Sequence, residues 1–174
     1  MNQTQTVERT LVVVKPDGVQ RGIVGEILTR FERVGLKMVG LKMLQPTQEH
    51  YHHHYETIGK LISRRGQGAF DSIVEFMQKG PVIAFVLEGV EAVSLVRKMT
   101  GATEPKSAQP GTIRGDYAHT SFAHADLHGV GVPNLIHASA DPEEAKAEIA
   151  HWFAETELYD YQTAHEHFTQ AKRK

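Results

Sequence analysis

Two short polar segments of this chain carry cations that suit phosphate binding. Lys15 follows an apolar run and begins Lys15-Pro16-Asp17-Gly18, where a compact ammonium matches a phosphate oxygen. Arg114 lies between the glycines of Pro110-Gly111-Thr112-Ile113-Arg114-Gly115-Asp116, which let the backbone approach a ligand. Its guanidinium can bind phosphate through two hydrogen bonds. Taken alone, an ordinary turn explains the first segment better and the second equally well, and neither is a Walker A loop.

A third segment, Asn134-Leu135-Ile136-His137-Ala138-Ser139, offers a nucleophile. Glu148 is the seventh residue of a helix expected to begin near Pro142, so its carboxylate could face back toward His137 and Ser139. A carboxylate bonded to both would hold the imidazole in one tautomer, as nucleophilic catalysis requires. A single His is more often structural, but the three segments together supply a nucleophile, two cations and an orienting carboxylate. That set fits phosphoryl transfer, which depends on positioning and on neutralising charge.

Composition narrows the class of protein. The chain has 174 residues, a net charge of -2 and no cysteine, which excludes disulfides, thiol catalysis and thiolate metal sites. The charge gives no basic field for nucleic acid, and the apolar runs at 11–14 and 82–87 are too short to cross a membrane. No apolar signal segment follows the polar first residues. We therefore expect a cytoplasmic protein with no membrane partner and no specific nucleic-acid partner.

The hydrophobic pattern predicts alternating strands and helices that position these segments. Strands are expected at 9–14, 36–44, 82–87 and 134–136, and helices at 23–34, after Thr47, around 70–77, at 90–99 and from Pro142 to about Phe153. The stretch 101–116 is expected to be a long ordered loop. Asp141 before Pro142 predicts the start of the last helix. This order predicts an α+β fold, with a small antiparallel sheet covered by helices.

Several motifs in a fixed order resemble the nucleoside diphosphate kinase family. They are Glu8-Arg9-Thr10, Lys15-Pro16-Asp17-Gly18-Val19-Gln20-Arg21-Gly22, the segment from Pro110 to Asp116, and the segment from Asn134 to Ser139. The resemblance extends over nearly all of residues 8–161. It implies a ferredoxin-like α/β sandwich, a single domain over 1–174 with a core at about 8–161, and peripheral tails at 1–7 and 164–174.

The resemblance implies a ping-pong kinase that moves the terminal phosphate from a nucleoside triphosphate to a nucleoside diphosphate. His137 matches the nucleophile that becomes phosphohistidine, Tyr55 an aromatic packed beside it, and Ser139 and Glu148 its orienting pair. The turn after His137 departs from the family, because Ala138-Ser139-Ala140 stands where Gly-Ser-Asp is usual.

The same resemblance implies how substrates are held. Lys15 matches a lysine that binds the transferred phosphate and a sugar hydroxyl, and Asn134 an asparagine that binds the ribose 3′ hydroxyl; Arg97, Thr103 and Arg114 match the phosphate clamp. ATP, GTP, other nucleotides and their deoxy forms are the expected partners. Mg²⁺ is the expected cofactor, carried by nucleotide phosphates rather than by protein side chains. A homo-oligomer is implied, a hexamer as in most members, with tetramers in some.

Two segments of the chain are longer than their counterparts in the family, and the resemblance connects the first with the nucleotide and the second with the family's oligomer contacts. Residues 58–68 are several positions longer than expected, and they precede the place of the family's base-stacking Phe, for which Phe70 is the candidate here. Arg64 and Arg65 in this insertion would add positive charge near the nucleotide. The second insertion covers roughly residues 119–132, and no role is assigned to either.

Two other functions fit parts of the sequence. His50, His53 and His54 are spaced so that one helix face could hold a metal, and His124 and His128 are four residues apart. Solvated histidines on polar segments are the commoner explanation of such clusters. The second alternative is a nucleotide-binding pseudoenzyme, which the altered turn after His137 and the two insertions would allow.

Overall fold

A computed structural model describes residues 7–169 of the chain. Four strands form one sheet in the order β2-β3-β1-β4, with every neighbouring pair antiparallel. They are β1 (Val7–Val14), β2 (Lys37–Leu44), β3 (Val82–Val90) and β4 (Ile136–Ala138). The predicted class, a small antiparallel sheet covered by helices, is therefore confirmed.

Alternation along β1 creates a separate hydrophobic core on each face of the sheet. Leu11 and Val13 point into the first core, and Val12 and Val14 into the second, because successive side chains of a strand face opposite sides. All four are essentially without solvent exposure. A strand buried on both faces explains why this segment is continuously apolar rather than alternating.

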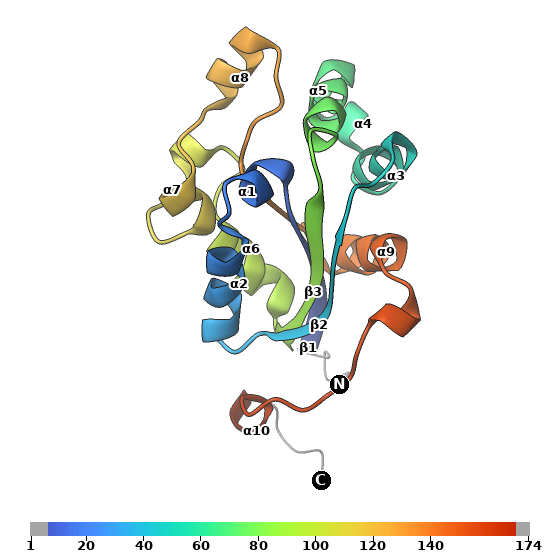
Figure 1. Cartoon of the computed structure of the whole chain (residues 1–174), viewed down its shortest axis with the longest axis vertical. Helices are drawn as coiled ribbons and strands as arrows, with labels where there is room; N and C mark the ends of the chain where they lie inside the picture. Colours follow the sequence, from blue (N-terminus) through green and yellow to red (C-terminus); the bar gives the residue numbers. More distant parts are fainter. Residues whose placement is uncertain (1–6, 170–174) are drawn as a thin grey trace, which may run out of the picture.

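Helices cover both faces, as Figure 1 shows. The first core is closed by segments that contribute Tyr51, Phe70 and Trp152: α3 (Gln48–His52), α5 (Gln67–Met77) and α9 (Pro142–Trp152). The second core is closed by α2 (Val24–Arg33), α6 (Ala92–Thr100) and α7 (Ile113–Tyr117). The remaining short elements are α1 (Pro16–Gln20), η1 (His53–Ile58, a π-helical turn), α4 (Leu61–Arg65), η2 (Pro105–Ser107), α8 (Phe122–His128), η3 (Glu155–Glu157) and α10 (Glu166–Thr169).

Local capping signals place the helix starts well. The side chain of Thr47 caps α3 by accepting the amide of His50, and Asp141 caps α9 by accepting the amide of Glu144 at 2.8 Å. Two predictions need correction. The fourth strand begins at Ile136, two residues later than expected, because Leu135 adopts a left-handed conformation (φ 69°).

The second correction concerns the stretch 101–116. It is not a continuous loop, because it contains η2 and most of α7, and the hydroxyl of Thr112 caps α7 by accepting the amide of Gly115. The two insertions also form helices, α4 and α8. They stand at the same end of the molecule, at the top of Figure 1, beyond the sheet.

The C-terminal part returns along the edge strand β2. Lys37 of β2 is nearly buried and makes ion pairs with Asp160 at 2.9 Å and with Glu166 of α10 at 3.3 Å. Of the tails expected at 1–7 and 164–174, residues 1–6 and 170–174 lie outside the described residues, whereas Val7 pairs with Val90. Within 7–169, no helix is both long and apolar enough to cross a membrane.

Candidate active site

A cavity of about 590 Å³ opens between the end of the sheet and the two insertion helices. Its size is within the usual range for sites that hold a small molecule. Predicted site residues from six separate segments line it: Lys15, Tyr55, Arg97, Thr103, Arg114, Asn134, His137 and Glu148. The structure thus brings together eight of the ten predicted residues. Ser139 does not line the cavity but is bonded to Glu148, which does, and Phe70 lies in the first core.

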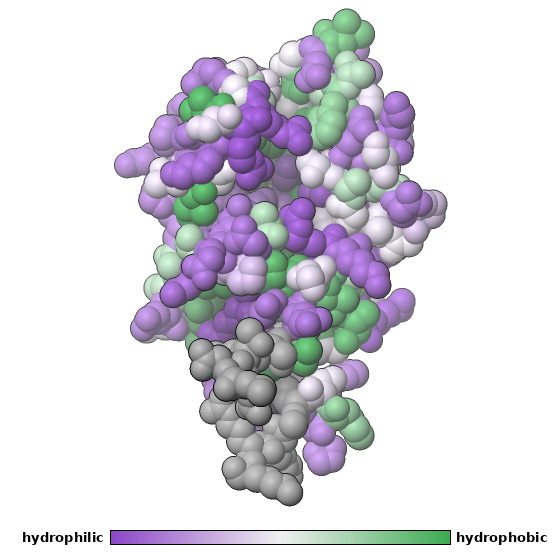
Figure 2. Space-filling model, turned by 180° about the vertical axis from the view of Figure 1, so that it is seen from behind, coloured by the Kyte–Doolittle hydropathy of each residue, from purple (hydrophilic) through white to green (hydrophobic). Residues whose placement is uncertain are grey.

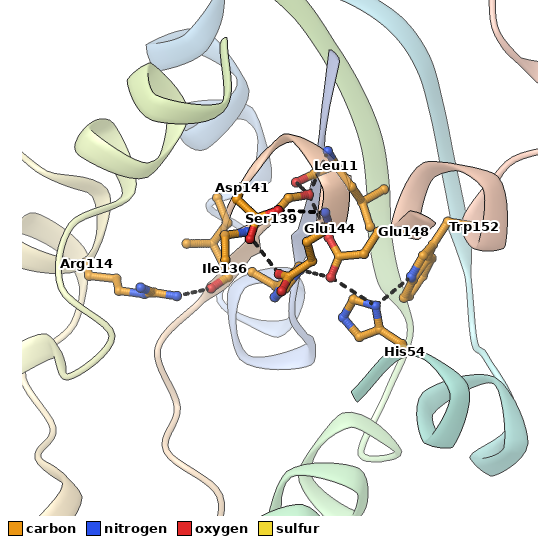
Figure 3. A network of polar contacts seen from close by, with 11 residues as sticks. Leu11, His54, Arg114, Ile136, Ser139, Asp141, Glu144, Glu148 and Trp152 are labelled. Atoms are coloured by element: carbon orange, nitrogen blue, oxygen red, sulfur yellow. Dashed lines mark hydrogen bonds and ion pairs between the residues drawn. The ribbon is translucent and has the colours of Figure 1, made fainter. Parts of the chain in front are cut away.

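His137 lies on β4 and is held by a carboxylate from α9. Its Nε2 is 2.8 Å from Oε1 of Glu148. The other carboxylate oxygen, Oε2 of Glu148, accepts a hydrogen bond from the hydroxyl of Ser139 at 2.6 Å, as Figure 3 shows. The Ser139 oxygen accepts the amide of Leu11 at 3.2 Å, which ties the network to β1. Glu148 and Ser139 are buried, so neither side chain can turn to solvent.

This bond determines the state of the imidazole. With Nε2 donating to Glu148, the lone pair of a neutral ring is on Nδ1, and no described residue is bonded to that nitrogen. Burial lowers the pKa of His137 far below its usual value, and the charge of Lys15 lowers it further. His137 therefore stays neutral and able to attack over the whole physiological pH range.

A second carboxylate occupies the unusual turn after His137. Glu144 accepts the amide of Ala140 at 2.9 Å, and its charge opposes the lowering of the His137 pKa. Asp141, which follows the turn, is used as the cap of α9. Glu144 thus provides the carboxylate beside this turn in a chain with Ala140 at the family's usual Asp position.

Lys15, which follows the end of β1, is hydrogen-bonded to Asn134. The Lys15 ammonium donates to Oδ1 of Asn134 at 2.7 Å, and the Asn134 amide donates to the carbonyl of Thr103 at 2.8 Å. Burial lowers the pKa of Lys15 to about 7, with a further lowering from Arg114 and an opposing effect of Asp17. An anion in the cavity would restore the positive charge on this lysine.

Arg114 is fixed by backbone rather than by carboxylates. Its guanidinium donates to the carbonyls of Asn134, Gly101 and Ile136, which uses three of its five N–H groups. Burial and the nearby charge of Arg97 lower its pKa to about 10, so it is still charged at neutral pH. Buried positive charge with spare donors, together with Lys15 and Arg97, makes this end of the cavity an anion site.

Two aromatic residues of η1 approach His137. Tyr55 lines the cavity, and its ring centre is 6.5 Å from that of His137; burial raises the pKa of its hydroxyl. His54 is closer, at 4.6 Å edge-on, and its Nδ1 accepts the indole N–H of Trp152 at 3.1 Å. Because an indole can only donate, His54 is neutral with its proton on Nε2.

Sequence reasoning considered His54 only as a member of a histidine cluster, which was either solvated or able to hold a metal, and so missed its place beside the nucleophile. A spacing of three from the buried Tyr51 is the signal that places it on the inner face of this helical segment. His50 and His53 instead stack on His151, with ring centres 3.9 Å and 4.4 Å from it. Among the described residues, His50, His53 and His54 are therefore not grouped around one possible metal position.

Phe70 does not reach the cavity. Its side chain is 6% exposed and packs in the first core, with its ring 5.3 Å from that of His52. Its neighbours Ala69 and Ile73 line the cavity instead, because α5 presents that face to the site and the Phe70 face to the sheet. The assignment of Phe70 to base contact is therefore corrected. Arg64 and Arg65 do line the cavity, as expected.

Comparison with known proteins gives one consistent family. The family model described as nucleoside diphosphate kinase matches residues 8–158. A nucleoside diphosphate kinase of Borreliella burgdorferi is 45% identical over 155 residues, which cover 89% of this chain and 92% of the relative. One from Pyrococcus furiosus is 45% identical over 167 residues, covering 96% of each.

Solved structures agree in fold. A transition-state mimic of the enzyme from Borrelia burgdorferi, with bound vanadate and ADP, has a TM-score of 0.92 at 43% identity, covering 95% of this chain and 98% of that one. A halophilic enzyme from Halobacterium salinarum in complex with CDP has a TM-score of 0.78 at 42% identity, covering 92% and 97%. The fold and the sequence thus point to the same family.

Proposed function

This chain belongs to the nucleoside diphosphate kinase family and transfers the terminal phosphate of a nucleoside triphosphate to a nucleoside diphosphate; we propose that the transfer passes through a phosphohistidine on His137. The observation that carries the proposal is the 2.8 Å contact between Nε2 of His137 and Glu148. It leaves Nδ1 as the nucleophilic nitrogen, at the wall of a cavity where Lys15, Arg97 and Arg114 supply positive charge, although Asp126 and Glu144 also line it.

In the first half-reaction, the lone pair of Nδ1 attacks the terminal phosphorus, and the bond from that phosphorus to the bridging oxygen breaks. The nucleoside diphosphate leaves with the electron pair. Because Nε2 keeps its proton, the phosphorylated ring carries positive charge, which Glu148 stabilises across the hydrogen bond. In the second half-reaction, a terminal oxygen of an acceptor diphosphate attacks the same phosphorus, and the pair of electrons returns to Nδ1.

The cations hold the moving group while its charge spreads. Lys15, Arg97 and Arg114 surround the phosphate end, and Thr103 and Asn134 complete the proposed clamp and ribose contact. These contacts recognise phosphates and sugar, and none of them reads a base. The vanadate and ADP in the Borrelia relative are consistent with such a site, because vanadate stands in for a transferring phosphoryl group.

We propose Mg²⁺ as the cofactor, carried by the phosphates. Among residues 7–169, the one group with metal-ligand spacing is His54, His137 and Glu148, whose ligand atoms lie within 4.8 Å of one another. This nitrogen-rich set is a poor match for Mg²⁺, which prefers oxygen ligands and keeps several waters. When bound, the ion would neutralise charge on the phosphate oxygens, in addition to the positive charge that Lys15 and Arg114 supply.

We also propose a cytoplasmic homo-oligomer, with a hexamer expected from the family, in which residues 8–161 fold as one domain. Leu41 and Met43 on the edge strand β2 are 48% and 58% exposed, which suits contact with another copy. Light scattering would give the number of subunits, calorimetry would show whether unfolding is a single transition, and cell fractionation would test location.

Phosphoenzyme trapping tests the chemistry. The protein is mixed with Mg²⁺ and γ-labelled ATP, quenched, and then chased with unlabelled GDP. We expect an alkali-stable, acid-labile label that moves to GTP, and no label in His137→Ala, which should still bind ADP. Protein that binds ADP but never acquires label would be a nucleotide-binding pseudoenzyme and would refute the proposal.

A further inference from the structure

The two insertions contact each other across the outer end of the cavity. Arg65 of α4 places its guanidinium carbon 5.0 Å from the centre of the Phe122 ring of α8. Both side chains line the cavity, and α4 and α8 stand at the end of the molecule where the space-filling surface is hollowed (Figures 1 and 2). Two helices that are more than fifty residues apart in the sequence, α4 and α8, therefore meet at the same opening of the cavity.

The cavity has two chemically different ends. Lys15, Arg114 and His137 form the inner end, where an anion would lie. The outer end is lined by Leu61, Phe122 and Val130, together with the stem of Arg65. A nucleotide with its phosphates at the inner end must direct its base outward, toward the two insertions.

Phe122 is the aromatic surface available to that base. Among the described residues that line the cavity, the only phenyl or phenol rings are those of Tyr55 and Phe122. Tyr55 is half-buried and lies beside His137, at the phosphate end of the cavity. Phe70 is enclosed in the core. The Phe122 ring is half-buried, with Arg65 over its face.

The Phe122 backbone is tied to the phosphate end of the site. Its amide donates to Oε1 of Glu104 at 3.0 Å, and Glu104 follows Thr103, whose carbonyl accepts the Asn134 amide. A second tie joins the amide of Lys106 to the carbonyl of Thr120 at 3.0 Å. The position of the Phe122 backbone relative to the phosphate clamp is thereby set before any nucleotide binds.

The other end of the same insertion rests on α5. A Cβ added to Gly131 would lie 2.7 Å from both Cβ of Phe76 and the carbonyl oxygen of Ser72, so only glycine permits this close approach. The insertion therefore connects α5 with the segment that carries Thr103, Glu104 and Lys106. The backbone that carries Phe122 is thus held at both ends of the insertion, which lowers the entropic cost of ordering it when a nucleotide binds.

We propose that the nucleobase stacks on Phe122 and that Arg65 moves from the phenyl ring to cover the outer face of the base. This inference rests on the proposed function, since it assumes phosphates at His137. Stacking on a phenyl ring and a guanidinium accepts any base, because every base has a π-face. The two insertions would thus supply base affinity without base selectivity, in place of the Phe70 contact.

The test compares ADP with ribose 5-diphosphate, which has the sugar and phosphates but no base. Binding of each to the full-length, unphosphorylated protein is measured by calorimetry for Phe122→Ala, Phe122→Trp and Arg65→Ala. We expect Phe122→Ala to raise the Kd for ADP about tenfold or more and to leave the Kd for ribose 5-diphosphate unchanged. Phe122→Trp should bind ADP at least as tightly as the unsubstituted protein. Arg65→Ala should raise the Kd for ADP roughly threefold and leave the Kd for ribose 5-diphosphate unchanged.

Phe168→Ala is the matched control, because Phe168 is 84% exposed on α10, at the opposite end of the molecule from α8. Equal losses for ADP and ribose 5-diphosphate in Phe122→Ala, or no loss for either, would overturn the proposal. Labelling of Phe122→Ala by saturating γ-labelled ATP distinguishes this outcome from failure of the kinase proposal. If Phe122→Ala acquires label normally but binds ADP more weakly, the stacking role is supported. If the unsubstituted protein itself acquires no label, the phosphohistidine proposal is refuted instead.

Discussion

The Nε2 atom of His137 and the Oε1 atom of Glu148 are 2.8 Å apart, although the residues belong to different elements, β4 and α9. Glu148 comes to this point because α9 packs along β1, and Ser139 holds its second oxygen at 2.6 Å. The contact selects one tautomer, and therefore one reactive nitrogen, on a ring with two chemically similar nitrogens.

Replacing Glu148 with Gln should slow phosphorylation without weakening nucleotide binding. The amide oxygen can still accept a hydrogen bond from Nε2, but no negative charge stabilises the phosphorylated ring. We expect phosphoenzyme formation to slow about 10- to 100-fold in rapid-quench experiments, with the Kd for ADP within about twofold. Glu143→Gln, an exposed change on the same helix, is the control and should have the original rate. An unaltered rate in Glu148→Gln would mean that the hydrogen bond alone, without its charge, suffices.

The low pKa of Lys15 predicts an alkaline limit for the free enzyme. As the pH rises through about 7, the buried ammonium loses its proton and with it part of the attraction for phosphate. We expect kcat/KM for ATP to fall above this pH, while kcat at saturation falls at a higher pH, because bound phosphate raises the pKa of Lys15.

Asp17→Asn provides a directional check on this assignment. The charge of Asp17 raises the pKa of Lys15, so its loss should move the fall in kcat/KM to lower pH. A profile that shifts upward or stays fixed in this variant would assign the alkaline limit to a group other than Lys15.

Neutral histidines that are buried or half-buried predict loss of stability in acid. Burial lowers the pKa of His50 to about 4, and it lowers the pKa values of His54, His137 and His151 as well. The unfolded chain, with values near 6.5, therefore takes up protons first, and the stability present above pH 6.5 is lost as the pH falls toward 4.

At a fixed protein concentration, we expect the unfolding temperature to be roughly 5–10 °C lower at pH 5 than at pH 7.5. His50→Gln removes one such group and should reduce the difference between the two pH values, whatever its effect at pH 7.5. Equal unfolding temperatures at both values would contradict neutral burial of these rings.

We predict that the segment from Pro110 to Asp116, which carries Arg114, can adopt its conformation only with glycine at position 115. A Cβ at this position would lie 2.0 Å from the carbonyl oxygen of Gln109, so Gly115→Ala must displace the segment that carries Arg114. We expect a loss of about 2–4 kcal/mol in the free energy of unfolding, and a fall in kcat/KM as Arg114 leaves its carbonyl partners.

Gly25→Ala is the comparison, because a Cβ there meets no atom within 4 Å and alanine favours the helix α2. It should leave activity unchanged and unfold at the same or a slightly higher temperature. If Gly115→Ala were as stable and active as Gly25→Ala, the close packing around Gln109 would not be required.

Much of the fold follows from local signals in the sequence. The apolar run of β1, the Thr47 cap of α3 and the Asp141-Pro142 start of α9 each depend on a few neighbouring residues, and each is found where expected. The start of β4 differs, because the positive φ of Leu135 is set by its surroundings: its amide donates to Asp17, and its carbonyl accepts the amide of Lys15. Both partners are more than a hundred positions away from Leu135, so the sequence around Leu135 does not predict these contacts.

The sequence by itself determined which residue types are available: a histidine, two kinds of cation and a carboxylate one helix away. The tertiary structure decided how they meet. Contacts such as that between Leu11 and Ser139, 128 positions apart, depend on how strands and helices pack, and no periodicity encodes them. For the same reason, only the fold showed that His54 stands beside His137, that Phe70 faces the core, and that Phe122 reaches the cavity from an insertion.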